Sequence, residues 1–103
     1  MTGFRVALLA NLKVNAPRIE GMPEDQWDDL DSEKTVLALV DAIRAGGNNC
    51  EFLEGDITLY DTVRKFKPDI CFNICEGHFG DAREAQIPAL LEMLRIPYTG
   101  SKV

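Results

Sequence analysis

Four short apolar runs alternate with three segments of helical pattern, and this alternation constrains the fold more than any other feature of the chain. Between the runs, apolar residues recur at three- and four-residue spacing, which indicates helices with one apolar face. The resulting β-α-β-α-β-α-β order predicts an α/β domain of three layers, α/β/α, around a four-stranded, mostly parallel sheet. We expect right-handed crossovers and a strand order of 2-1-3-4. The expected strands cover residues 4–10, 50–53, 69–74 and 96–99.

The first two helices have recognisable ends. Asp31 or Ser32 is expected to cap the first helix, and Glu33 lies in its first turn, where a negative charge favours the helix dipole. The pair at 46–47, Gly-Gly, ends that helix. The second helix should stop before Pro68, because the residue before a proline is biased away from helical geometry.

The third helix is expected over about residues 84–94 and contains a proline. Pro88 lacks an N–H, which is harmless only in the first turn of a helix. Either the helix begins near Ala85, or its first turn is distorted. The apolar residues beyond the proline are predicted to form the buried face: Ala89, Leu90, Leu91, Met93 and Leu94.

Composition narrows the class of protein. A chain of 103 residues with 46% hydrophobic and 27% charged residues predicts one globular domain over residues 1–103. A formal net charge of -6 argues against nucleic acid or an anionic membrane as a partner. No apolar run approaches the roughly 20 residues that span a bilayer, and no signal peptide is recognisable, so we expect a cytoplasmic protein.

The three cysteines lack the spacing of a metal site or a redox pair. They fit reduced, buried thiols, although Cys75, nearer the loop, is expected to be accessible.

Two loops are expected to face one another across a crevice at the carboxyl edge of the sheet. The first covers residues 11–30 and is acidic, with Trp27 as an apolar anchor. The second covers residues 75–83, and its glycines, Gly77 and Gly80, allow a ligand to approach the backbone closely. A plain tight turn is the alternative for these glycines. His78 in the same loop is more often solvated than catalytic in such a position.

Three motifs in the last quarter of the chain follow a known order. They are Gly77-x-x-Gly80-Asp81, then Gln86 with Leu90-Leu91-Glu92, then residues 96–101, Ile-Pro-Tyr-Thr-Gly-Ser. In this order and without gaps they resemble the N-terminal domain of D-alanine–D-alanine ligases, members of the ATP-grasp superfamily. The resemblance covers roughly residues 4–101 and is specific over 77–101. It implies a Rossmann-like pre-ATP-grasp domain.

The resemblance also implies an activity for a parent enzyme in peptidoglycan biosynthesis. Such a ligase uses ATP and Mg²⁺ to convert a carboxylate to an acyl phosphate, which the amine of a second D-alanine attacks. ATP and Mg²⁺ would be bound by ATP-grasp domains that are absent from this chain. We therefore expect no catalytic, cofactor-binding or metal-binding residue here, an isolated chain that is inactive, an amino acid as ligand, and a homodimer as one option.

The same resemblance implies which residues bind the substrate: Ser32, Glu33, Glu76, Gly77, Gly80 and Asp81. Glu76 replaces a histidine of the family pattern, and Asp81 replaces a glutamate. The loop over 11–30 replaces a short glycine-rich loop that carries a substrate-binding glutamate in the family. The residues that could take over that role are Asp28, Asp29, Asp31 and Glu33.

Two other functions are compatible with the sequence. The chain could be a free-standing α/β module that binds a small molecule and has no ligase activity, or a dimerising structural fragment with an exposed apolar surface. A phospho-receiver is disfavoured, because the first and third strands are not followed by the acids it needs.

Overall fold

The computed structural model describes residues 3–12, 21, 32–75 and 83–100. Strands and helices alternate along the chain in the expected order. They are β1 (Arg5–Ala10), α1 (Glu33–Ala45), β2 (Asn49–Glu54), α2 (Leu59–Phe66), β3 (Ile70–Asn73), α3 (Arg83–Met93) and β4 (Tyr98–Thr99).

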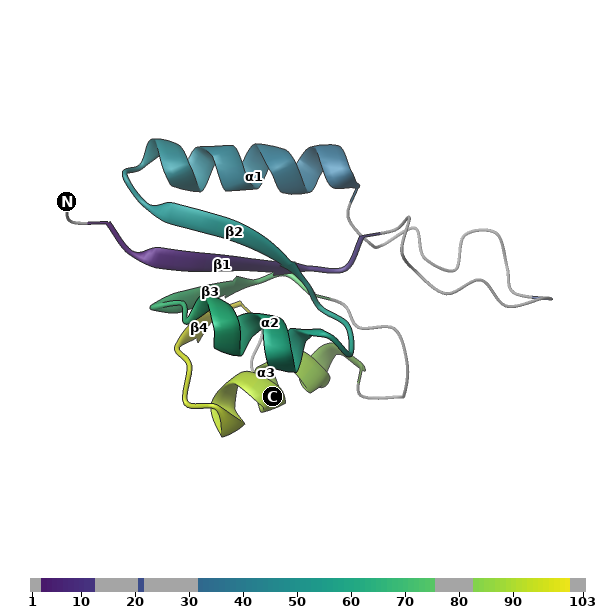
Figure 1. Cartoon of the computed structure of the whole chain (residues 1–103). Coiled ribbons are helices and arrows are strands. Elements are labelled where there is room, and N and C mark those ends of the chain that lie inside the picture. Colours follow the sequence, from purple (N-terminus) through teal and green to yellow (C-terminus); the bar gives the residue numbers. More distant parts are fainter. Residues whose placement is uncertain (1–2, 13–20, 22–31, 76–82, 101–103) are drawn as a thin grey trace.

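The four strands form one parallel sheet in the order β2-β1-β3-β4. In the register of the two central pairings, Leu8 of β1 lies opposite Phe52 of β2 on one side and Phe72 of β3 on the other. Figure 1 shows α1 on one face of the sheet and α2 with α3 on the other. The predicted layers, parallel strands and 2-1-3-4 order are therefore confirmed.

Each face of the sheet has its own apolar core. Neighbouring residues of β1 point to opposite faces, as the two-residue period of a strand requires, so Leu8 packs toward α1 and Leu9 toward α2 and α3. The core under α1 contains Val6, Leu8, Ala10, Leu12, Val36, Val40 and Cys50. The core under α2 and α3 contains Ala7, Leu9, Leu59, Val63, Phe66, Cys71, Cys75, Ile87 and Leu91.

The start of α1 is set by Ser32, one of the two caps that the sequence allowed. Its Oγ accepts the Thr35 N–H at 3.2 Å, which satisfies a donor that the helix itself leaves without a partner. Asp31, the other candidate, lies outside the described residues. The helix ends before Gly47, whose φ of 90° belongs to the left-handed region that favours glycine.

The end of α2 is fixed by Arg5 at the beginning of β1. The Arg5 guanidinium donates to the Phe66 carbonyl at 2.5 Å and to the Lys67 carbonyl at 3.4 Å, and it stacks 4.3 Å from the centre of the Phe66 ring. A cation at this end also complements the helix dipole. The helix therefore stops before Pro68, as predicted.

The third helix matches its predicted range of about 84–94 to within one residue at each end. It begins at Arg83, so Pro88 lies inside the helix, and of the two alternatives for this proline the start near Ala85 is not the one found. Ile87 and Leu91 are buried one turn apart and define the face toward the sheet. Met93 is 77% exposed, because two residues beyond Leu91 a helix has turned by about 200°.

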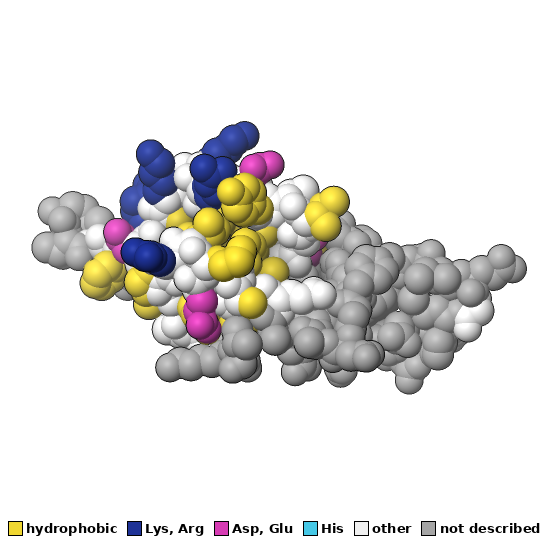
Figure 2. Space-filling view, turned by 90° about the horizontal axis from the view of Figure 1, so that it is seen from below, with side chains coloured by type: hydrophobic (Ala, Val, Ile, Leu, Met, Phe, Trp, Pro, Cys, Tyr) yellow, Lys and Arg dark blue, Asp and Glu magenta, His cyan; other side chains and the backbone are white. Residues whose placement is uncertain are grey.

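Ala89 is exposed too, so the prediction that Met93 and Ala89 belong to the buried face is wrong. Figure 2 shows apolar side chains exposed on the face that carries α2 and α3, beside lysine and arginine side chains. The exposed large apolar residues on or next to these helices are Ile57, Tyr60 and Met93.

Candidate functional site

The candidate site lies at the edge of the sheet where β1, β2 and β3 end and where α1 begins (Figure 1). β1 and β3 are neighbours, yet the helices that follow them, α1 and α3, cover opposite faces. Such a reversal is the switch point at which open α/β sheets bind their ligands.

Two buried asparagines mark this switch point. Asn11 directly follows β1 and is 1% exposed, while Asn73 ends β3 and is 5% exposed. They are the buried polar side chains of the described part of the chain. Asn11 Nδ2 donates to the Gly55 carbonyl at 2.8 Å, and Asn73 Oδ1 accepts the Cys75 N–H at 3.0 Å. Asn11 thus ties the end of β1 to the turn after β2, and Asn73 shapes the exit of β3.

Two glycines allow the chain to close tightly around the asparagines. A Cβ on Gly55 would lie 2.3 Å from Cys75 Sγ and 3.1 Å from Asn11 Nδ2. Gly100 has a φ of 110°, and a Cβ there would lie 2.3 Å from the Asn73 carbonyl oxygen. Any side chain at either position would displace backbone or buried atoms.

All three cysteine side chains are buried. Cys75 is 9% exposed beneath Gly55, so the expectation that it is accessible is wrong. All three cysteines are free thiols, as predicted. Burial raises the pKa of the Cys71 thiol to about 12. Burial also raises the pKa of Cys50, although the charge of Arg44 opposes that shift. Neither Cys50 nor Cys71 is therefore poised as a thiolate nucleophile at neutral pH.

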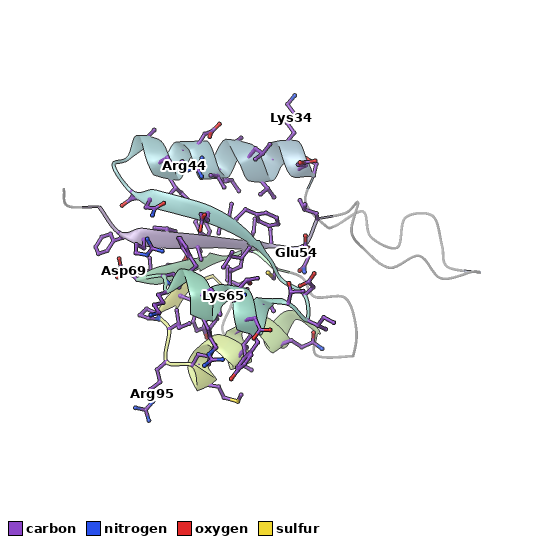
Figure 3. All side chains as sticks on the ribbon, viewed as in Figure 1. Lys34, Arg44, Glu54, Lys65, Asp69 and Arg95 are labelled. Atoms are coloured by element: carbon purple, nitrogen blue, oxygen red, sulfur yellow. The ribbon has the colours of Figure 1, made fainter. Side chains whose placement is uncertain are left out.

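Two acidic side chains lie at and just beyond the end of β2. Glu54, labelled in Figure 3, ends β2, and its Oε2 accepts the Leu12 N–H at 2.9 Å. Asp56 Oδ1 accepts both the N–H and the hydroxyl of Thr58. Among the described residues, no three His, Cys, Asp or Glu side chains are placed to hold a metal ion. The edge therefore combines carboxylates, which suit an ammonium group, with neutral amides, which suit oxygen or nitrogen atoms of a ligand.

Of the predicted substrate-binding residues, Ser32 and Glu33 lie at this edge, at the start of α1. Besides its cap bond, the Ser32 hydroxyl is 3.0 Å from Thr35 Oγ1, whereas the Glu33 side chain is exposed. The other four, Glu76, Gly77, Gly80 and Asp81, lie outside the described residues, as do His78, Trp27 and most of the two facing loops.

Three residues of the edge were not predicted as site residues, namely Asn11, Glu54 and Asn73. Each is a polar residue at the end of an apolar run: Leu-Leu-Ala-Asn, Phe-Leu-Glu and Cys-Phe-Asn. A polar residue at that point is the available signal, but it equally indicates where a strand leaves the core.

The fold and the comparison with known proteins both bear on the family of this domain. A parallel sheet with a switch point between β1 and β3 defines a Rossmann-like α/β domain. No family model matches the chain, and no solved structure matches it significantly. Curated proteins do match it.

Several of these matches carry the name D-alanine–D-alanine ligase. The ligase from Pelagibacter ubique is 34% identical over 83 residues, which is 81% of this chain and 26% of the ligase. The ligase from an Anaeromyxobacter species is 35% identical over 72 residues, which is 70% of this chain and 23% of the ligase. A protein of Sinorhizobium fredii described as uncharacterized is 36% identical over 87 residues, 77% of this chain and 25% of that protein.

The chain spans about a quarter of the length of these relatives. The matches and the motifs together identify it as a D-alanine–D-alanine ligase-like domain, and their extent fits the N-terminal domain of such a ligase.

Proposed function

We propose that the chain is the substrate-side domain of an ATP-dependent carboxylate–amine ligase that joins two D-alanine-like amino acids for the cell wall. The observation that carries the proposal is the identity with proteins named D-alanine–D-alanine ligase over most of this chain. The sheet supports it, because the edge at the switch point is where an α/β domain receives a small molecule.

In this proposal, the chemical steps of the ligase reaction take place on domains other than this one. ATP and Mg²⁺ would be bound by ATP-grasp domains, which activate the carboxylate as an acyl phosphate. The proposal itself assigns no step of the reaction to this chain. This chain would form one wall of the amino-acid pocket. The proposal further includes a location in the cytoplasm and a homodimer as one option.

Six residues are proposed to line that wall: Ser32, Glu33, Glu76, Gly77, Gly80 and Asp81. The exposed Glu33 carboxylate, in the first turn of α1, suits the ammonium of an amino acid through a charge-assisted hydrogen bond. Ser32 supports this position through its cap bond to Thr35, which fixes the first turn.

The test is release of ADP from ATP and Mg²⁺ in the presence of D-alanine. The 103-residue chain should release none, whereas the same chain joined to the remaining three quarters of the Pelagibacter ubique ligase should release ADP with D-alanine and not with L-alanine. The intact ligase serves as the positive control. If the joined, folded protein shows no dependence on D-alanine, and a nucleotide alone raises the melting temperature of the 103-residue chain, the free-standing binding module is the better description.

A further inference from the structure

The further inference starts from one side-chain nitrogen, Asn73 Nδ2. The Cys75 N–H donates to one end of the Asn73 amide at 3.0 Å, and only the oxygen can accept it. The other end is therefore the NH₂ group, which carries two donors. Within the described part of the chain, no group accepts a hydrogen bond from it.

The burial of Asn73 makes this amide unusual. The residue is only 5% exposed, at the end of β3. A buried donor without a partner costs stability, and native proteins rarely keep one without a purpose. Asn11 is the other buried asparagine at the switch point, and its Nδ2 donates a hydrogen bond to the Gly55 carbonyl. The two amides therefore differ in one respect. The Asn11 NH₂ group donates a hydrogen bond within the protein, whereas the Asn73 NH₂ group has no acceptor among the described residues.

The position of the amide indicates what it is available for. β3 is next to β1 at the switch point, and Asn73 is the last residue of the strand. Gly100 closes over the Asn73 backbone, since a Cβ there would lie 2.3 Å from the Asn73 carbonyl oxygen. The amide is thus held by packing and by the Cys75 N–H, so a ligand would meet a donor that is already oriented.

The charges around the site restrict the ligand. Glu54 and Asp56 lie at the same edge, and the whole chain carries a formal net charge of -6. This field disfavours a phosphate, which brings uncompensated negative charge, and tolerates a zwitterionic amino acid, whose ammonium balances its carboxylate.

We propose that Asn73 Nδ2 is a substrate-binding donor of this domain and that it binds a carboxylate oxygen of the amino acid. The inference rests on the proposed function for the identity of the ligand. It adds a binding residue outside the six that the resemblance implies.

The test is an NMR titration in which Asn11 is the internal control. The side-chain NH₂ signals of both asparagines are followed in the ¹⁵N-labelled chain during addition of D-alanine, D-alaninamide or inorganic phosphate. D-alanine should shift the Asn73 NH₂ signals saturably and leave those of Asn11 in place. D-alaninamide, which lacks the carboxylate, and phosphate should shift neither.

Two matched variants separate binding from a structural role. Asn73→Asp keeps an oxygen to accept the Cys75 N–H, removes the donor and adds a negative charge that repels the ligand carboxylate, so it should weaken D-alanine binding by at least about tenfold. Because both changes act on the carboxylate of the ligand, the preference for D-alanine over D-alaninamide should fall by at least the same factor. Asn11→Asp adds the same charge at the same edge and removes the bond to Gly55, so it should lower the urea midpoint and reduce that preference by less than Asn73→Asp does.

The outcomes are distinguishable. If D-alanine shifts the backbone signals of Ser32 or Glu33 while the Asn73 NH₂ signals stay in place, the inference is overturned and the proposed function stands. If phosphate shifts the Asn73 signals as strongly as D-alanine, the donor is not specific for an amino acid, and the inference is again wrong. If D-alanine shifts no signal, the inference is overturned, and the ADP assay decides the proposed function separately.

Discussion

At the scale of single residues, burial decides the behaviour of the thiols. Cys71 is fully buried between β1 and β4, with Ala7 opposite it on one side and Tyr98 on the other. Its thiolate would lose hydration without gaining a counter-charge, which is why its pKa is raised to about 12 from an ordinary value of 9.0.

This shift predicts a loss of stability in alkali. Below pH 9.0 the thiol is protonated in both the folded and the unfolded chain, and its contribution is fully present. As the pH rises from 9.0 toward 12, the unfolded chain loses this proton first, so the free energy of unfolding falls. Urea unfolding followed by circular dichroism at several pH values measures the slope.

Cys71→Ala provides the control, because it removes the titrating group from a site that accepts a small side chain. The variant should be less stable at pH 7 and should show a shallower decline above pH 9.0. An identical decline in both proteins would show that other groups account for the alkaline loss.

Residue by residue, the sequence predicted local roles better than long-range ones. The cap at Ser32 follows from the residue type and its place before a helix, so it could be predicted and is confirmed. The pairing of Asn11 with Gly55 spans 44 positions, and no local pattern indicates it. The same holds for the burial of Cys75, which depends on the packing of Gly55 above it.

At the scale of elements, β2 is the exposed flank of the sheet. It pairs with β1 alone in the described structure, and its six residues contain no proline or lysine, so Glu51 and Glu54 are its only charged residues. Asn49 and Gly55 donate inward, to the Phe4 and Ala10 carbonyls. By alternation, Cys50 and Phe52 therefore turn their backbone groups outward.

Arg44 covers part of this edge. Its Nε donates to the Cys50 carbonyl at 3.0 Å, so one outward acceptor is occupied by a charged side chain from the last turn of α1. We expect Arg44→Ala to expose that carbonyl and to strengthen self-association of the chain about fivefold, the worth of one hydrogen bond of about 1 kcal/mol. Sedimentation velocity over a range of concentrations measures this.

Lys34→Ala is the matched control, since Lys34 belongs to the same helix and points away from the sheet in Figure 3. It removes the same charge and should leave sedimentation unchanged. Equal association of the two variants would mean that net charge, and not the cover over Cys50, controls the edge.

Whole elements were predictable where the apolar pattern is regular. β1 matches its predicted range to within one residue, and α1 and α2 end where predicted, because buried strands and amphipathic helices leave a strong periodic pattern. The range of α3 was also predicted to within one residue, but its buried face was not, since its apolar residues occupy more than one face and only packing on the sheet selects Ile87 and Leu91. β4 is shortened to two residues, a length that no sequence period can indicate.

At the scale of the whole molecule, β1 joins the two apolar cores. Its residues alternate between the layer under α1 and the layer under α2 and α3, and the strand lies between β2 and β3. The strand order could be predicted from crossover handedness and element order, which act on the chain as a whole. The arrangement of the loops over 11–30 and 75–83 stays a prediction, because most of their residues lie outside the described part of the chain.

This arrangement predicts that the two layers unfold together. Leu8 and Leu9 are adjacent in the chain and both fully buried. Leu8 packs in the core under α1, and Leu9 packs in the core under α2 and α3. Leu8→Ala and Leu9→Ala should each lower the free energy of unfolding by about 2–5 kcal/mol, since each leaves a cavity in a closed layer. Urea unfolding should remain a single transition with an unchanged slope against urea concentration in both variants.

Amide hydrogen exchange locates the effect. If β1 couples the layers, Leu8→Ala should speed exchange in α2 as much as in α1, although α2 lies on the other face of the sheet (Figure 1). Leu9→Ala should do the same in reverse. Faster exchange confined to α1 in Leu8→Ala would show that the layer under α1 opens by itself, and that the sheet carries two separable units rather than one cooperative domain.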